Sequence, residues 1–277
     1  MRILVTGAAG QLGRALLPAL ANHEVVALPR AALDIADPAA VRAVLAAQSP
    51  AVVINAAAYN EVDRAEADFA AALRTNAEGP RLLALAAAGR GASIVHVSTD
   101  YVFDGRASRP YVESDAPNPL SAYGRSKRAG EEAVIAANPR HFVVRTAWLY
   151  SAEGRNFPNT MRRLASQGPL RVVDDQRGSP TYAPHLAKAL AGLVASGDFG
   201  LHHLAGAGDA SWFELTRALC RGLRLDVPIE PVTTEAFPRP APRPRYSVLD
   251  TQRHPARRLP PWEDGLAEYV RAVKAAA

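Results

Sequence analysis

The chain has 277 residues, which is enough for one large domain or for a domain with a substantial annex. Hydrophobic residues make up 48% and charged residues 21%, a balance typical of a globular protein rather than a disordered one. The formal net charge of +5 comes partly from six arginines within residues 239–258, so the partners to consider are anionic.

Several classes are excluded by what the sequence lacks. There is no run of apolar residues long enough for a membrane-spanning helix and no signal-peptide pattern, so we expect neither export nor a membrane partner. Cys220 is the single cysteine, which rules out an intrachain disulfide and a cysteine-based zinc site and fits a cytoplasmic protein. No nucleic-acid-binding motif accompanies the arginines, so we expect no nucleic-acid partner.

In the first half of the chain, β-branched runs alternate with alanine-rich helical stretches. The sequence predicts strands at 2–6, 24–28, 51–55, 93–98 and 142–146, and helices at 11–21, 38–47, 65–88 and 122–137. Strands that are apolar throughout are typical of a parallel sheet that is covered on both faces. The alternation therefore predicts an α/β fold with a doubly wound parallel Rossmann sheet.

After Trp148 the alternation of strands and helices becomes less regular. We expect helices near 156–166, 185–196 and 212–223, strands near 170–173 and 200–205, and a mostly extended segment over 228–261, rich in proline and arginine. The division predicted is a dinucleotide-binding domain over 1–149 and a smaller, mainly substrate-binding domain over 150–277. Elements near 185–205 are expected to return to the sheet.

A glycine-rich turn follows the first strand and opens the first helix. It reads Gly7-x-x-Gly10-x-x-Gly13 within "VTGAAGQLG". Glycines at this spacing allow a tight turn, and the helix N-terminus offers N–H groups and a positive dipole end to a pyrophosphate. A glycine pattern alone is a weak signal, but its position between a strand and a helix predicts dinucleotide binding.

The end of the second strand bears on the choice of cofactor. An acid there typically holds the ribose hydroxyls of NAD, whereas an arginine suits the 2′-phosphate of NADP. The strand runs into Arg30, and the nearest acid is Asp34. We therefore expect NADPH, with NADH left open, and the alternative role of Arg30 is that of a solvated loop residue.

A tyrosine and a lysine lie four residues apart in "SAYGRSKRAGE", and on a helix Tyr123 and Lys127 share a face. A free tyrosine has a pKa of about 10, and a nearby cation would lower it toward a useful range for proton transfer. Ser98, Thr99 and Asp100 follow the fourth strand, at the edge of the sheet where ligands bind in such folds. A hydroxyl there could hold a substrate carbonyl, or it could simply cap the strand.

Together these motifs give the chain a family resemblance. The glycine turn and the Tyr–Lys pair resemble the extended short-chain dehydrogenase/reductase superfamily. Three further motifs, "STDYVF", "RTAWLY" and "DQRGSPT", are similar to those of the dTDP-4-dehydrorhamnose reductase family. The related 4,6-dehydratases carry Thr-Asp-Glu where this chain has Thr99, Asp100 and Tyr101, so a dehydratase is not expected.

The resemblance implies NAD(P)H-dependent reduction of the C4 keto group of dTDP-4-dehydro-6-deoxy-L-mannose to dTDP-L-rhamnose. It implies that Tyr123 protonates the nascent alkoxide, that Lys127 lowers the pKa of Tyr123 and holds the nicotinamide ribose, and that Thr99 binds the C4 oxygen. The residues expected to bind the cofactor are Gly7, Gly10, Gln11, Leu12, Arg30, Asp34, Ile35, Asn55, Ala56, Ala57, Asn76, Tyr123 and Lys127. Those expected to bind the substrate are Thr99, Asp100, Tyr123, Trp148, Asn156 and Arg243.

The sequence also departs from the family. Some members bind magnesium through glutamates at places that here hold Arg14, Ala15 and Pro184. We therefore expect no metal site, and a homodimer stays open because a metal-bridged one is in doubt. Glu61 is an additional acid that either contacts the sugar or is a solvated charge.

Two alternatives to this function remain. One is a 4-ketoreductase acting on another dTDP-deoxysugar. The other is a non-catalytic NADP-binding regulatory subunit resembling the β subunit of methionine adenosyltransferase, although such a module has no need to keep Thr99, Tyr123 and Lys127 together.

Three further features are expected to be structural. His202 and His203 are adjacent on a strand and point to opposite faces, so they cannot easily share a metal. Cys220 and Trp212 are expected to pack in the core.

Overall fold

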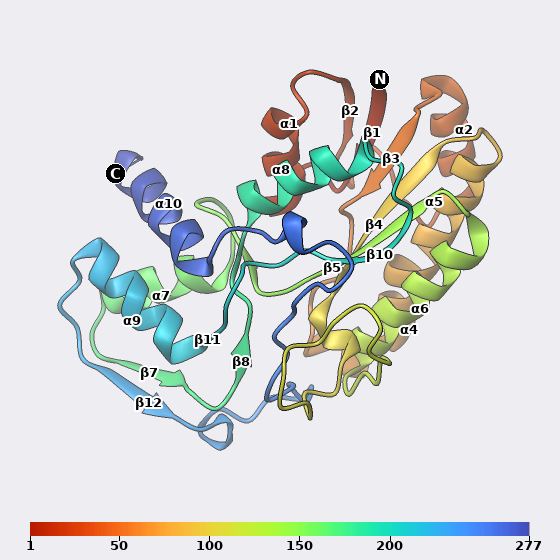
Figure 1. The fold of residues 1–277 in the computed structure, drawn as a ribbon. Helices are drawn as coiled ribbons and strands as arrows, with labels where there is room; N and C mark the ends of the chain where they lie inside the picture. The colour runs from red at the N-terminus through yellow and green to blue at the C-terminus, as the bar shows by residue number, and fades with distance from the viewer. Residues whose placement is uncertain (277) are drawn as a thin grey trace.

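The computed structural model describes residues 1–276 and contains a six-stranded parallel sheet in the order β10-β5-β4-β3-β1-β2 (Figure 1). The strands are β1 (Arg2–Thr6), β2 (Glu24–Leu28), β3 (Val52–Asn55), β4 (Ser93–Thr99), β5 (His141–Thr146) and β10 (Gly200–His203). The predicted doubly wound α/β fold is confirmed, and each predicted strand of the first half is present. β10 lies beside β5, so the chain returns to the sheet after leaving it. The domain boundary itself stays a prediction.

Helices cover both faces of the sheet because successive strand residues point to opposite sides. Ile3 and Val5 pack with α1 (Gln11–Ala19) and α8 (Ala183–Val194). Leu4, between them, packs on the other face with α2 (Pro38–Gln48), α5 (Gly79–Ala88) and α6 (Ala122–Ala137). Burial on both faces explains why these strands read as continuous apolar runs.

The single helix predicted over 65–88 is wrong. The chain there forms α3 (Arg64–Ala67), α4 (Phe69–Leu73), a π-helical turn (Arg74–Glu78) and α5. Asp68 causes the first break, because its carboxylate accepts the N–H of Ala71 and so caps α4. Pro80 lacks the N–H that an α-helix would use at that position, and the backbone widens just before it.

The C-terminal half builds a second layer from short elements. They are β6 (Leu149–Tyr150), α7 (Phe157–Ala165), β7 (Leu170–Val173), β8 (Arg177–Gly178), β9 (Thr181–Tyr182), β11 (Ala210–Ser211), α9 (Trp212–Leu223) and β12 (Ile229–Val232). They form three two-stranded sheets, β11-β8, β12-β7 and β6-β9. The segment after β12 is mostly extended, as predicted, with short 3-10 turns at Thr234–Ala236 and Pro255–Arg257.

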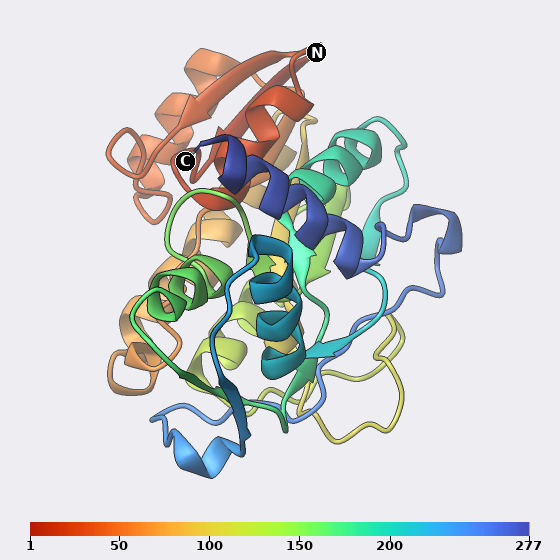
Figure 2. The same cartoon turned by 90° about the vertical axis from the view of Figure 1, so that its left-hand side faces the viewer.

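A last helix, α10 (Trp262–Ala275), was not predicted. Figure 2 shows α10, in dark blue, beside α9, and Figure 1 shows both apart from the central sheet. Leu266, Tyr269, Val270 and Val273 bury one face of it at helical spacing, packed with Leu215 and Leu219 of α9. That apolar spacing was present in the sequence. Within residues 1–276, no helix combines the length and apolar composition needed to cross a bilayer.

Candidate active site

The glycine-rich turn adopts the geometry that its motif predicts. Gly7 has a φ of +66°, and a Cβ atom there would lie 2.6 Å from the Ala57 nitrogen. A Cβ on Gly13 would lie 2.6 Å from the Ala8 Cα, so α1 can lie against the turn only with glycine there. α1 then begins at Gln11, and among the described residues no side chain caps it. Within residues 1–276, the first N–H groups of α1 are therefore without a side-chain cap at the turn.

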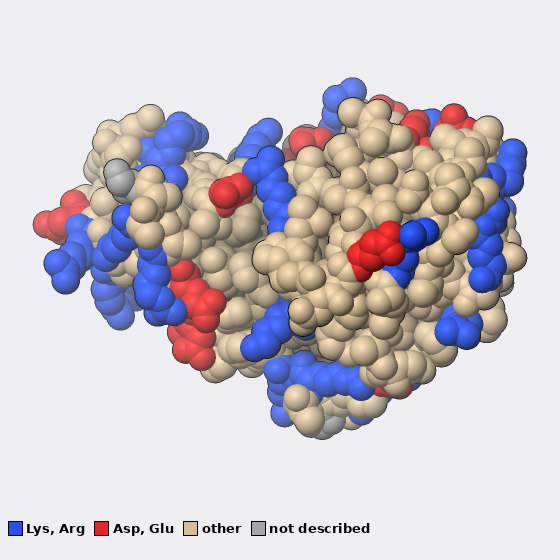
Figure 3. Space-filling model, turned by 90° about the horizontal axis from the view of Figure 1, so that it is seen from above, with Lys and Arg blue, Asp and Glu red and all other residues tan. Residues whose placement is uncertain are grey.

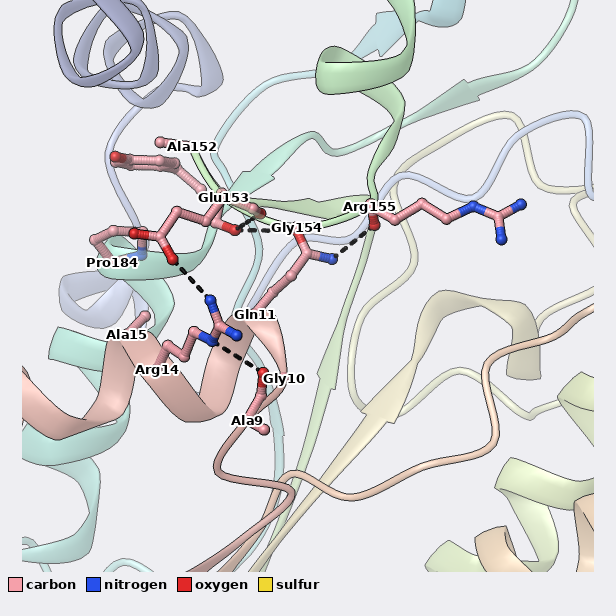
Figure 4. Close-up of a pocket in the computed structure, with 12 residues that line it drawn as sticks. Ala9, Gly10, Gln11, Arg14, Ala15, Ala152, Glu153, Gly154, Arg155 and Pro184 are labelled. Carbon is pink, nitrogen blue, oxygen red and sulfur yellow. Dashed lines mark hydrogen bonds and ion pairs between the residues drawn. The ribbon is translucent and has the colours of Figure 1, made fainter. Parts of the chain in front are cut away.

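A cavity of about 350 Å³ lies over this turn and is closed on its far side by residues 151–155 (Figure 4). Asn156, which caps α7, donates through its side-chain amide to Gln11 Oε1 at 2.8 Å. Arg14 and Glu153 form an ion pair at 2.8 Å across the same gap. The loop is thus fastened to α1 at two points.

The end of β2 carries more positive charge than the sequence alone indicated. Arg30 is exposed, and Asp34 is bound by Arg74 at 2.6 Å. The hydrogen bond from Arg74 is the main reason why the pKa of Asp34 lies below its ordinary value. Ile35 is buried against Gly79, where a Cβ would clash with it. Sequence reasoning missed Arg74, because nothing in the local pattern connects it with Asp34.

Two predicted cofactor residues use their side chains to hold the backbone in place. Asn55 accepts from the Thr6 hydroxyl at 2.6 Å and contacts His96 at 3.1 Å. Asn76 bonds both backbone groups of Tyr59 and the Ser126 hydroxyl, at 2.8 to 3.0 Å. Both amides are fully buried. They fix the loop at 55–59 that carries Ala56 and Ala57.

α6 begins where two independent acceptors fix its first turn. The Ser121 hydroxyl accepts the Gly124 N–H at 3.1 Å, and the carboxylate of Glu66 accepts the Ala122 N–H at 2.7 Å. Gly124 and Gly130 let the helix approach the backbones of Tyr101 and Asn76, since a Cβ at either would overlap a carbonyl oxygen. Tyr123 is thereby placed in the first turn, against the end of β4.

The phenol of Tyr123 is buried beside Thr99, with Tyr101 edge-on to its ring at 5.7 Å. Its hydroxyl donates to Asn60 Oδ1 at 3.5 Å, a contact that the sequence did not predict. Burial raises the pKa of Tyr123 above its ordinary value, and only the neighbouring Thr99 hydroxyl opposes this. Lys127 is not among the causes of this shift, and its expected lowering of the pKa of Tyr123 stays a prediction.

Lys127 is also buried, and its ammonium donates to the Val97 carbonyl at 2.6 Å. Burial lowers the pKa of Lys127 to about 8, and Glu131 one turn further along α6 opposes this shift. Glu131 is itself held by Arg145 through two bonds of 2.8 Å. The ammonium of Lys127 is thus fixed by the Val97 carbonyl, and the buried Glu131–Arg145 ion pair lies one helical turn away.

Thr99 and Asp100 stand at the end of β4, where the strand gives way to a 3-10 turn (Asp100–Val102). The Thr99 hydroxyl donates to Asp100 Oδ1 at 3.0 Å and accepts the Tyr101 N–H at 3.2 Å. The hydroxyl is therefore tied to its own turn, as the capping alternative predicted, while it lies next to Tyr123.

The model of the RmlD substrate binding domain family matches residues 1–275. The chain belongs to this family.

Two curated relatives and one solved structure illustrate the likeness. A probable dTDP-4,6-dihydroxy-2-methyloxan-3-one 4-ketoreductase from Streptomyces antibioticus is 47% identical, over 100% of this chain and 97% of that protein. A dTDP-4-dehydrorhamnose reductase from Streptomyces griseus is 46% identical, over 98% and 94% respectively. The crystal structure of a dTDP-4-dehydrorhamnose reductase from Bacillus anthracis in complex with NADP is 36% identical, covers 98% and 99%, and has a TM-score of 0.95.

In this RmlD-family chain the predicted substrate residues lie in different surroundings. Trp148 stacks on Trp212 with ring centroids 3.3 Å apart, and Gly178 leaves space for its indole. Asn156 contacts Gln11 on the glycine-turn side, as described above. Arg243 pairs with Asp63 at 2.6 Å, next to Tyr101. The structure thus connects Arg243 with the Tyr123 side of the site and Asn156 with the glycine turn.

Arg14, Ala15 and Pro184, the positions at which the resemblance would place metal-binding glutamates, all line the cavity over the turn. Arg14 presents a guanidinium paired with Glu153 there, and the other two positions present no carboxylate. Glu61 is exposed, next to Asn60.

The remaining features have the structural surroundings expected of them. Cys220 is buried beside Leu170 and Val172, and Trp212 packs against Trp148. His203 contacts the carbonyls of Tyr111 and Asp250. His202, Asp198 and His254 lie close enough to hold a metal, but Arg253 and Arg257 already pair with the Asp198 carboxylate.

Proposed function

We propose that this chain reduces the C4 keto group of dTDP-4-dehydro-6-deoxy-L-mannose to give dTDP-L-rhamnose. The observation that carries the proposal is the burial of the Tyr123 phenol directly beside Thr99, at the carboxyl edge of the sheet and on the same edge as the glycine-rich turn. In parallel α/β sheets ligands bind at that edge. The Streptomyces griseus relative, whose name states this activity, supports the choice of reaction.

In the proposed reaction Tyr123 is the proton donor. Hydride addition turns the C4 carbonyl into an alkoxide, a far stronger base than a phenolate, so a tyrosine that has kept its proton can donate it. Thr99 would turn its single hydroxyl proton from Asp100 to the same oxygen. Lys127 holds the ribose next to the nicotinamide and supplies positive charge once Tyr123 has lost its proton.

The cofactor is a nicotinamide dinucleotide, and we infer a preference for NADPH. When bound, it supplies the hydride. The glycine turn and the uncapped start of α1 suit a pyrophosphate, with Gly7, Gly10, Gln11 and Leu12 around it. Arg30 and Arg74 would meet the 2′-phosphate, because Asp34 is already bound to Arg74. Ile35, Asn55, Ala56, Ala57 and Asn76 would complete the site, and the NADP complex of the Bacillus anthracis protein supports this choice.

The substrate would lie between Tyr123 and the C-terminal layer. Asp100, Trp148 and Arg243 would face it, and Asn156 would meet it beside Gln11. We propose that no metal is required, because Arg14 and Glu153 already neutralise each other where family members carry glutamates.

A second candidate is the reduction of another dTDP-deoxysugar. The relative from Streptomyces antibioticus, named for a different keto sugar, is as similar to this chain as the relative from Streptomyces griseus. The Tyr123 chemistry would be the same, and only the pocket around the sugar would differ.

The test is NADPH oxidation, followed by absorbance, with each of the two keto sugars prepared in situ and with a metal chelator in a parallel run. Turnover of dTDP-4-dehydro-6-deoxy-L-mannose that is indifferent to chelator would support the first proposal. Turnover of only the other sugar would select the second. Tight NADPH binding without turnover of either would favour the regulatory-subunit alternative.

We propose that the protein is cytoplasmic and has no nucleic-acid or membrane partner. Whether it forms a homodimer is left open. Figure 3 shows basic side chains in several separate groups with acidic ones between them. In the arginine-rich segment, Arg243, Arg253, Arg257 and Arg258 are each paired with an aspartate. This pairing supports a structural use of the charge rather than a nucleic-acid surface.

A further inference from the structure

A buried carboxylate at the end of β4 joins two hydroxyl groups from distant parts of the chain. Asp100 accepts from the Thr99 hydroxyl at 3.0 Å through one oxygen and from the Ser247 hydroxyl at 2.6 Å through the other. Relative exposure is 8% for Thr99, 2% for Asp100 and 1% for Ser247. Such hydrogen bonds to an ionised acceptor, shielded from water, are stronger than neutral ones.

The backbone around Ser247 explains how its side chain reaches this position. The Ser247 N–H donates to the Arg177 carbonyl at 2.8 Å, and the Arg177 N–H donates to the Arg245 carbonyl at 2.8 Å. One residue later, the Val248 carbonyl accepts from Tyr111 at 2.8 Å. Backbone hydrogen bonds hold the segment on both sides of Ser247. The Ser247 hydroxyl is not needed for this docking and donates to the Asp100 carboxylate.

A second serine docks the same segment without touching Asp100. Ser179 is fully buried, and its hydroxyl accepts the Leu249 N–H at 3.2 Å. Docking of the segment is therefore already provided by Ser179 and by backbone bonds. What distinguishes Ser247 is its partner, the carboxylate that holds Thr99.

We propose that Ser247 is a positioning residue that fixes Asp100, and through it holds the Thr99 hydroxyl beside Tyr123. This proposal rests on the proposed function, in which the Thr99 hydroxyl exchanges its bond to Asp100 for one to the oxygen that is reduced. Without Ser247 the Asp100 carboxyl would be free to rotate, and the Thr99 hydroxyl would start that exchange from another orientation.

The electrostatics of the carboxyl provide a way to detect this role. Burial raises the pKa of Asp100 to about 6, while the bonds from Ser247 and Thr99 oppose the shift. The titratable groups facing it are Tyr101 beside it and Tyr123 from α6, both with a raised pKa. Both are neutral when Asp100 titrates, and Arg243 next to Tyr101 is paired with Asp63. Removing the Ser247 hydroxyl removes a donor to the ionised form, so the pKa of Asp100 must rise further.

The experiment compares Ser247→Ala, Ser247→Thr and Ser179→Ala with the wild type. For each protein, kcat and KM are measured as a function of pH over the range in which Asp100 titrates. For Ser247→Ala we expect kcat to fall about tenfold with little change in KM, the size of one lost hydrogen bond. We expect the pH transition of kcat/KM to move up by about one unit. Ser247→Thr should restore both quantities, and Ser179→Ala should leave the transition where it is.

Two results would overturn the proposal. Equal losses in Ser247→Ala and Ser179→Ala with an unmoved transition would show that Ser247 only docks the segment, and wild-type behaviour of Ser247→Ala would show no role. If the wild type reduces neither keto sugar, the proposed function fails instead. In that case carbon-13 NMR of the Asp100 carboxyl, assigned with Asp100→Asn, still decides, because an unchanged pKa in Ser247→Ala refutes the coupling.

Discussion

Helix α6 and the segment 241–251 both bring side chains to the end of β4, but they do so by different means. α6 delivers Tyr123 and Lys127 from one face of one helix, so their spacing is fixed by the helical repeat. The segment has almost no regular structure and delivers Arg243 and Ser247 through bonds to Asp63 and Asp100. One side of the site is set by local geometry and the other by contacts between distant residues.

The difference predicts where each side is sensitive. Replacing Tyr123 on α6 without disturbing the helix removes a reacting group and little else. A change in the segment disturbs a chain of contacts, so its effect should appear as altered binding, as altered titration or as a moderate loss of kcat, and not as the loss of a reacting group. The variants below test this contrast.

Tyr123→Phe should have the largest effect on activity. It removes the proposed proton donor while the ring stays packed against Tyr101, and general acid catalysis typically contributes about 10² to 10⁴-fold. We expect kcat to fall by that range with KM little changed, measured by NADPH oxidation. Tyr101→Phe is the matched control and should keep most of the activity. Equal losses in both variants would mean that packing, rather than the proton, matters on this side.

The ion pair behind Lys127 should have the largest effect on stability. Burial alone would raise the pKa of Glu131, but the hydrogen bonds and the charge of Arg145, together with the neighbouring Ser98 and Arg128, outweigh it, and the pKa lies below its ordinary value. Glu131→Gln leaves the buried Arg145 without its charge partner, which typically costs about 3 to 5 kcal/mol of unfolding free energy. Denaturant unfolding measures this loss. The stabilisation is present above the ordinary pKa of a glutamate, and it should disappear as pH falls through the folded pKa.

The neighbouring glutamate gives the control. Glu132 is 60% exposed and pairs with Arg128 at 2.8 Å. Exposed pairs contribute at most about 1 kcal/mol, so Glu132→Gln should unfold almost as the wild type does. A comparable loss in both variants would contradict the assigned role of the buried pair.

The same contrast explains how far the sequence alone could predict the molecule. The sheet, the glycine turn and the Tyr123–Lys127 face follow from local periodicity, and each was predicted correctly. The break at Asp68 and the wide turn before Pro80 depended on a single cap and a single missing N–H, which the apolar pattern of 65–88 hides. α10 was missed although its apolar spacing was readable.

Contacts between distant residues account for the rest. Ser247 lies 147 residues from Asp100, and Arg74 lies 40 residues from Asp34. No periodicity connects such residues, so neither Ser247 nor Arg74 could be assigned to the site. The burial that raises the pKa of Tyr123 is likewise a product of the fold, and the Tyr123–Lys127 spacing could not indicate it.

Arg243→Met tests the segment side of the comparison. It removes the guanidinium but keeps a similar apolar stem, so we expect KM for the keto sugar to rise about tenfold, the size of one charged contact, with kcat within about twofold. Asp63→Asn should have a smaller effect, because Arg243 stays but loses its anchor. Arg245→Met, at an exposed position two residues away, is the control. A fall in kcat as large as that of Tyr123→Phe, with KM unchanged, would contradict a binding role for Arg243.

The smallest effect is expected at the end of β2, far from the reaction. Arg74→Ala removes one positive charge and at the same time frees the Asp34 carboxylate, which Arg74 now holds at 2.6 Å. A free carboxylate there suits the ribose hydroxyls of NADH and repels a 2′-phosphate. We therefore expect the ratio of kcat/KM for NADPH over NADH to fall severalfold, up to about tenfold, or 1.4 kcal/mol. Arg30→Ala should lower it less, since Asp34 stays bound to Arg74, and Arg90→Ala at the end of α5 should leave it unchanged. A ratio that stays constant in both Arg74→Ala and Arg30→Ala would remove the charge argument for NADPH while leaving the Tyr123 chemistry intact.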